Sequence, residues 1–188
     1  MKKMKTYGLC ASLLFVLVCS LFAFDTEDLD TLLKTGECSD CDLREVDFSG
    51  KTVGPIRVYK GDLSKSLFRN TIFVTSVFEM IKFNKCNLDQ VNFSNCSINK
   101  GSYKKCGING ADFSGATVTE TIFSKSEIIG TSFRNATVRY CDFSGCDLHD
   151  ADFRGTDLTG TGFTKCDLNG VLTDGDTIGP EGEKGWRP

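Results

Sequence analysis

Residues 111–160 decide the fold, and in groups of five they read ADFSG ATVTE TIFSK SEIIG TSFRN ATVRY CDFSG CDLHD ADFRG TDLTG. The third residue of every group is Phe, Val, Ile or Leu, and the first is small or β-branched. A period of five fits neither an α-helix, which repeats every 3.6 residues, nor a simple strand, which repeats every two. The pattern therefore predicts a chain that turns a corner every five residues and points one large side chain inward from each side.

The same lattice extends well beyond this stretch. All 26 positions taken at five-residue intervals from Leu43 to Leu168 are Leu, Phe, Val, Ile or Tyr, and no insertion interrupts them. Every Phe after residue 24 lies on this lattice. Gly or Asn recurs two residues after the large side chain, where a tight corner favours residues that tolerate positive φ.

The groups CDLRE, ADFSG, CDFSG, ADFRG and TDLTG resemble the A-(D/N)-L-x-x pattern of the pentapeptide-repeat family, over residues 41–170. The resemblance implies an all-β fold, a right-handed quadrilateral β-helix with 20 residues in each coil. Coils stacked at the strand spacing of ~4.8 Å would make a rod about 30 Å long. Two opposite sides would then be aromatic, and the two between them aliphatic.

The chain divides into four expected segments. Residues 1–24 carry three lysines followed by an apolar run, which is typical of a signal peptide cleaved after Ser20 or Ala23; a retained membrane anchor is the alternative. Residues 25–40 predict a short capping α-helix and lead-in, with Leu29, Leu32 and Leu33 on one face. Residues 41–172 are expected to form the solenoid. The Gly-rich residues 173–188 predict a flexible tail, from which Trp186 can fold back on the last coil.

The charge balance disfavours nucleic acid as a partner. Without residues 1–24 the chain has 19 basic and 25 acidic residues, a net charge of −6, with no basic stripe accompanied by base-reading groups. His149 is the only histidine, and no nucleophile or metal-spaced cluster accompanies it. We therefore expect no catalytic residues, no cofactor and no metal site.

Eight cysteines follow residue 24. Most of them occupy the small inward position of the lattice, where Cys behaves as a buried small hydrophobe. Cys38 lies outside that position, so Cys38 and Cys41 form a candidate disulfide in an oxidising compartment.

A row of lysines is the most conspicuous surface feature. Lys65, Lys85, Lys105, Lys125 and Lys165 occupy equivalent corners of successive coils, with Gly145 as the single gap. Two interpretations stay open: a basic ridge for an acidic partner, or a charged edge that prevents sheets from aggregating.

Outward apolar residues gather around the second coil, and the set comprises Leu67, Ile72, Val74, Val77 and Met80. It predicts either a contact patch for a partner or a surface covered by the first coil and its Pro55 loop.

These features favour a non-catalytic scaffold, periplasmic or secreted in a bacterium, which binds a protein or an anionic envelope component. Membrane contact is expected only through an uncleaved leader, and an end-to-end homodimer is a further expected partner. The resemblance also offers an alternative, a DNA-mimicking, gyrase-protecting protein that confers fluoroquinolone resistance. The leader and the 15 acids against 16 bases of residues 41–170 both disfavour that alternative.

Overall fold

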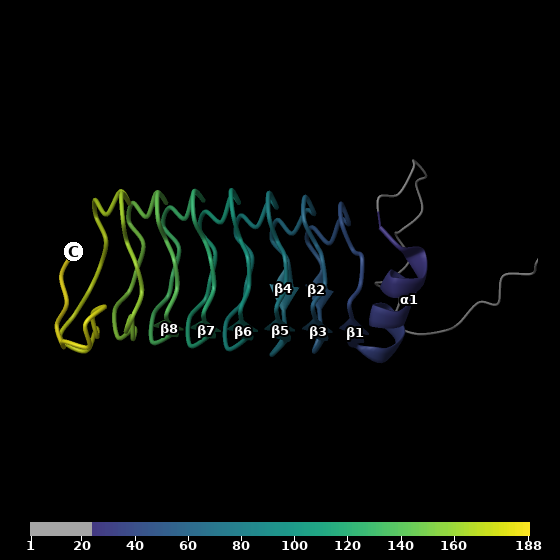
Figure 1. Ribbon diagram of the computed structural model, residues 1–188, viewed down its shortest axis with the longest axis horizontal. Helices are drawn as coiled ribbons and strands as arrows, with labels where there is room; N and C mark the ends of the chain where they lie inside the picture. The colour runs from purple at the N-terminus through teal and green to yellow at the C-terminus, as the bar shows by residue number, and fades with distance from the viewer. Residues whose placement is uncertain (1–23) are drawn as a thin grey trace, which may run out of the picture.

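The computed structural model describes residues 24–188 as a straight stack of coils with one helix at its N-terminal end (Figure 1). Each coil pairs in parallel with the coil twenty residues further along the chain, so that Val58 lies beside Phe78 and Phe78 beside Ile98. Four sides of five residues account for this twenty-residue offset. The chain is therefore a four-sided parallel β-solenoid, and the predicted fold class is confirmed. The predicted leader, residues 1–24, lies outside the described residues except for Phe24.

Regular secondary structure is sparse because each side is so short. One side carries a six-stranded parallel sheet in the order β1-β3-β5-β6-β7-β8, a neighbouring side carries the pair β2-β4, and single bridges join the coils elsewhere. The elements are α1 (Thr26–Thr35), β1 (Glu37–Ser39), β2 (Thr52–Val53), β3 (Arg57–Tyr59), β4 (Ile72–Phe73), β5 (Val77–Glu79), β6 (Ser97–Asn99), β7 (Thr117–Thr119) and β8 (Thr137–Arg139).

We number the sides by the inward residues of one coil: side 1 contains Phe83, side 2 Leu88, side 3 Phe93 and side 4 Ile98. All four side chains are fully buried, as are their equivalents at twenty-residue intervals through most of the stack. The core is thus a continuous column along the axis of the rod.

The aromatic sides 1 and 3 meet across the axis, as the sequence predicts. Along side 3 the rings of Phe93 and Phe113 are stacked with centroids 5.1 Å apart, and Phe113 and Phe133 repeat this at 5.0 Å. Across the axis, Phe113 meets Phe123 of side 1 edge to face at 6.2 Å. Both geometries are favourable for aromatic pairs, so each ring is held by neighbours in its own ladder and in the opposite one.

Helix α1 closes the N-terminal end of the core. The Asp25 carboxylate caps the helix by accepting from the Glu27 N–H at 2.8 Å, and Gly36 ends it with a φ of 75°. Leu29 and Leu32 are buried, and the Asp28 carboxylate accepts the backbone N–H of Asp42 at 2.8 Å. The helix therefore covers the N-terminal end of the core and bonds backbone groups of the first coil that would otherwise be unpaired.

The C-terminal segment is packed, which differs from the loose tail expected for residues 173–188. The Thr177 side chain is buried and its hydroxyl donates to the carbonyl of Phe153, while Trp186 stacks on Phe163 with ring centroids 5.3 Å apart. Asp157 pairs with Ile178, 21 residues later instead of 20. This one-residue insertion shifts the segment off the five-residue lattice, which is why the sequence pattern does not reveal that it continues the stack.

Tyr103 provides a test of the core. Its hydroxyl is buried and has no hydrogen-bond partner within residues 24–188, and burial raises the pKa of this phenol well above its usual value. We expect Tyr103→Phe to raise the free energy of unfolding by about 1–3 kcal/mol, because a buried unsatisfied hydroxyl is removed. Denaturant unfolding measures this change. The matched control Phe123→Tyr, one coil along the same ladder, should lower stability, and a destabilised Tyr103→Phe variant would contradict the prediction.

Candidate functional site

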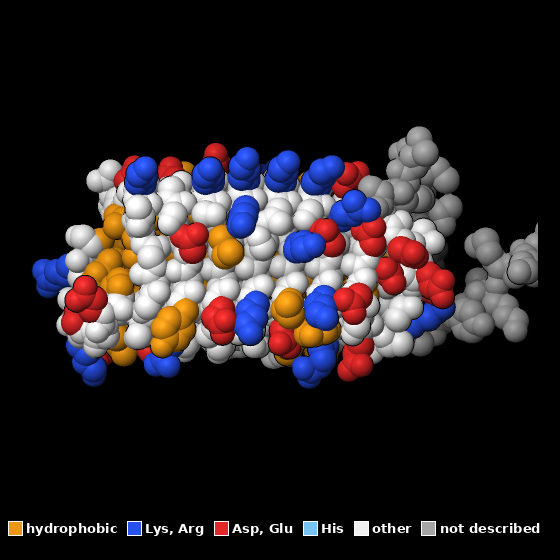
Figure 2. Space-filling view, in the orientation of Figure 1, with side chains coloured by type: hydrophobic (Ala, Val, Ile, Leu, Met, Phe, Trp, Pro, Cys, Tyr) orange, Lys and Arg blue, Asp and Glu red, His pale blue; other side chains and the backbone are white. Residues whose placement is uncertain are grey.

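The lysine ridge, defined as Lys65, Lys85, Lys105, Lys125 and Lys165, forms the corner between side 1 and side 2. Each lysine adopts a positive φ of 59–65°, the left-handed conformation that turns the chain from one side to the next. The Lys85 N–H donates to the carbonyl of Lys104 at 2.9 Å, and the Lys105 N–H donates to Ser124 in the same way at 3.3 Å. The corners therefore stack coil upon coil, and Figure 2 shows the resulting row of basic side chains along one edge of the rod.

Most of the ridge has no acidic partner. Lys65 pairs with Glu45, with Nζ 3.1 Å from Oε1. The other four lysines are exposed and make no ion pair with any acidic residue of 24–188. Because neighbouring lysines lie roughly one strand spacing apart, their charges repel one another, and a row of anionic groups along the edge would relieve that repulsion.

Two further lysines extend the basic surface onto side 1. Lys82 and Lys104 are both exposed, and Lys82 lies 4.0 Å from a carboxylate oxygen of Asp62. The sequence analysis did not include these two lysines, because it considered only the corner positions. They could have been found from the outward lattice positions, since Lys82 directly precedes the inward Phe83 and Lys104 directly follows the inward Tyr103.

The five apolar residues of the predicted contact patch form a belt around the second coil instead of one flat patch. Leu67 lies on side 2, Ile72 on side 3 and Val77 on side 4, while Val74 and Met80 lie at the corners that follow sides 3 and 4. Leu67, Ile72, Val74 and Met80 are each 40–46% exposed, and Val77 is half-buried. The first coil and its Pro55 loop therefore leave them largely uncovered.

The six free cysteines among residues 24–188 lie in the wall of the core. Cys106 Sγ donates to the carbonyl of Phe83 at 2.9 Å, and Cys146 Sγ donates to that of Phe123 at 3.1 Å. Ser126 and Thr131 make the same bond through their hydroxyls, each to the inward residue 23 positions earlier. The thiols thus take a repeated structural role.

Cys38 and Cys41 are joined in a disulfide, with Cα atoms 6.0 Å apart. Cys38 belongs to β1, directly after the C-terminal end of α1, and Cys41 follows the next corner. The disulfide therefore links the segment after the helix to the first coil. No group of three His, Cys, Asp or Glu side chains within residues 24–188 is arranged to hold a metal ion.

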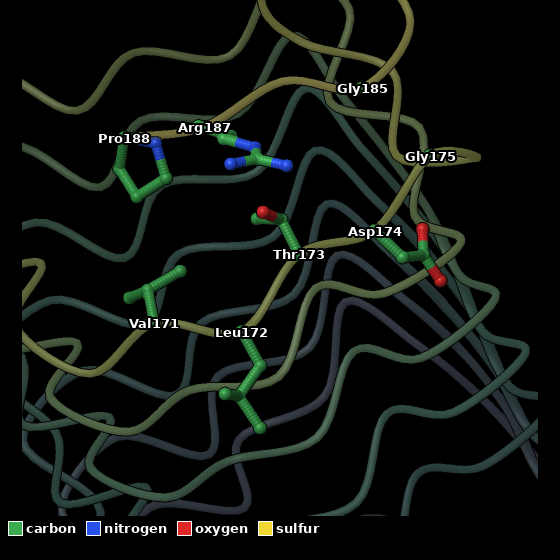
Figure 3. Close-up of a pocket in the computed structure, with 8 residues that line it drawn as sticks. All are labelled: Val171, Leu172, Thr173, Asp174, Gly175, Gly185, Arg187 and Pro188. Carbon is green, nitrogen blue, oxygen red and sulfur yellow. The ribbon is translucent and has the colours of Figure 1, made fainter.

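A hollow of 430 Å³ lies at the C-terminal end of the rod, and Figure 3 shows the side chains around it. Val171, Leu172 and Thr173 of the last coil form one wall, and the guanidinium of Arg187 reaches over Thr173 from the returning tail. Its charged and hydroxyl groups come from Thr173, Asp174 and Arg187. Among residues 24–188, no helix has the length and apolar character needed to cross a membrane.

Comparison with known proteins identifies the repeat. The family model for the "Pentapeptide repeat region" matches residues 98–172. No curated protein matches the chain.

Several solved structures are similar to this chain at low sequence identity. HetL, a pentapeptide repeat protein involved in heterocyst differentiation regulation in the cyanobacterium Nostoc sp. strain PCC 7120, is 18% identical with a TM-score of 0.50, over 75% of each chain. Rfr23 from the cyanobacterium Cyanothece 51142 is 18% identical, with a TM-score of 0.33 over 82% of this chain and 98% of its own. QnrB1, a plasmid-mediated fluoroquinolone resistance protein, is 18% identical, with a TM-score of 0.45 over 73% and 93%.

The buried thiols should be unreactive in the folded chain. Burial raises the pKa of Cys106, Cys141 and Cys146 to about 12, so each thiol stays protonated at neutral pH. Among the six free cysteines of residues 24–188, we expect an alkylating reagent at about pH 8 to label only the half-buried Cys166 at an appreciable rate, as read by mass spectrometry. Labelling in denaturant is the control, and native labelling of Cys106 at the unfolded rate would contradict the prediction.

Proposed function

Because the chain is a pentapeptide-repeat protein, we propose that it acts as a non-catalytic, exported scaffold that binds an acidic surface through its lysine ridge. In each group of five residues, one large side chain points inward and fills the axis of the rod. Only the corners and the outward positions are therefore left to recognise a partner. The lysine ridge is the observation that carries the proposal. Four of its five lysines are exposed and have no acidic partner among residues 24–188, although each is held at a fixed place by the backbone of its coil.

The shape of the ridge favours an extended row of anionic groups. A rod holds its corners in a straight line, so a flat or linear acidic surface can contact several lysines at once. Once the rod is oriented by its first contact, each further contact adds attraction at little additional entropic cost. The affinity for an acidic surface should therefore rise more strongly with the charge density of that surface than it would for scattered lysines. The mixed charges of the coils give no uniformly negative exterior, and this weakens the DNA-mimic alternative.

Export is the second part of the proposal. Residues 1–24 have the composition of a signal peptide, and a disulfide such as Cys38–Cys41 persists in oxidising compartments. The periplasm and the exterior of a bacterium both meet that condition.

The ridge is tested by reversing its charge. The variant Lys85→Glu/Lys105→Glu/Lys125→Glu should bind vesicles rich in anionic lipid, or polyglutamate, at least about tenfold more weakly than the parent chain. Parent binding should also fall as salt rises, because the contacts are exposed.

The matched control carries the same change in net charge elsewhere. Lys51→Glu/Lys60→Glu/Lys100→Glu alters three exposed lysines away from the ridge and should retain most of the binding. Equal loss in both variants would show that net charge matters and that the ridge does not.

Export is tested by cell fractionation and by the mass of the purified chain. We expect the protein outside the cytoplasm, beginning at Leu21 or Phe24 after removal of the leader. A full-length cytoplasmic protein would overturn the export proposal and favour the gyrase-protecting alternative.

A further inference from the structure

A line of free hydroxyl groups runs along side 1 directly beside the lysine ridge. Ser124, Ser144 and Thr164 occupy the outward position immediately before the corner residue in three successive coils, and we call them the hydroxyl row. Each is half-buried or exposed, and its hydroxyl has no hydrogen-bond partner among residues 24–188. This edge therefore presents positive charges next to neutral hydrogen-bonding groups, and both repeat at the coil spacing of ~4.8 Å.

Asn84 and Lys104 continue the same line toward the N-terminal end. The Asn84 side-chain oxygen accepts the hydroxyl of Ser102 at 2.7 Å and the backbone N–H of Lys104 at 3.0 Å. The amide NH2 of Asn84 has no acceptor among the described coils and is free to donate. Five successive coils thus carry a hydrogen-bonding or basic side chain beside the ridge.

Carboxylates limit the width of the basic strip in its C-terminal half. Asp142 lies on side 1 in the coil of Gly145, and Asp147 and Asp167 occupy outward positions on side 2. A broad anionic plane pressed against this corner would bring its own charges toward these carboxylates. A single chain lying along the edge would contact the lysines and the hydroxyl row instead, so the arrangement favours one linear polyanion over a bilayer.

Spacing and side-chain type distinguish between linear polyanions. An extended peptide presents side chains on one face at every second residue, about 6.6 Å apart, so its carboxylates fall out of step with the coils. A nucleic acid strand stacks its bases on aromatic side chains. The exposed aromatic residues of 24–188 are Tyr59 and Tyr140, which lie on side 4 and at the corner after it. A chain of uronic-acid sugars has neither difficulty, because every ring carries both a carboxylate and hydroxyls.

We infer that a linear acidic polysaccharide binds along this edge, with its carboxylates on the lysine ridge and its ring hydroxyls on the hydroxyl row. The inference rests on the proposed function, because it names the chemical class of the ridge's acidic partner. From Lys85 to Lys165 the ridge spans four coil spacings, about 19 Å. The ligand is therefore a stretch of several sugars held at several points, and its affinity falls as salt rises.

The gap in the ridge at Gly145 allows a gain-of-function test. Gly145 has a φ of 69°, close to that of the ridge lysines, and a Cβ there would contact only the Lys125 side chain, at 3.8 Å. Gly145→Lys should therefore fold normally, complete the row and bind polygalacturonate about threefold more tightly in titration calorimetry. The matched control Gly130→Lys adds the same charge between sides 2 and 3, with a φ of 61° and open space around the Cβ, and should bind like the parent.

Removal of the hydroxyls separates recognition of the sugar from attraction to its charge. Ser124→Ala/Ser144→Ala/Thr164→Ala retains every lysine, but it should bind polygalacturonate at least about threefold more weakly because hydrogen bonds to the rings are lost. Its affinity for polyglutamate should equal that of the parent. The parent itself should bind polygalacturonate more tightly than polyglutamate of the same total charge.

Any of four results would overturn the inference: equal affinity of the parent for the two polymers, no weakening in the alanine variant, equal affinities of Gly145→Lys and Gly130→Lys, or tighter binding to anionic vesicles than to polygalacturonate. The last result would identify a bilayer as the partner. The proposed function survives all four, provided that charge reversal of Lys85, Lys105 and Lys125 still weakens binding to vesicles or polyglutamate. Loss of that effect would count against the proposed function itself.

Discussion

The whole structure depends on the filling of one narrow axis by inward side chains at every fifth residue. Each coil is too small to bury a core alone, so its stability comes from the coils above and below it. The backbone bonds between coils fix the offset at twenty residues, and this fixes which side chains stack. An insertion within the stack would move every later inward residue toward the exterior. The one insertion among the described coils occurs between Leu172 and Thr177, where only the closing turn remains to be placed.

The same constraint separates structural from functional positions. The inward lattice positions are occupied by stacked rings and aliphatic side chains. Several of the small positions before them carry a hydroxyl or thiol that donates to a carbonyl of the previous coil. Cysteine at these places serves as a variant of serine or threonine. Recognition is left to corners and outward positions, which the fold repeats at equal intervals. A charge placed once is isolated, but the same charge placed in every coil becomes a straight row.

The sequence predicts the core and the lysine ridge because both follow from counting residues on an unbroken lattice. Phe93, Phe113 and Phe133 lie where the count places them. The folding back of Trp186 was expected, but the rest of the packed C-terminal segment was not predicted, because the insertion before Thr177 removes the period that reveals an inward position. The apolar residues of the second coil were predicted to point outward. The prediction grouped them as one patch, whereas the corners between them place them on three different sides of the rod. The unpaired hydroxyl of Tyr103 could not be predicted either, because the lattice shows only that residue 103 points inward and does not distinguish Tyr from Phe.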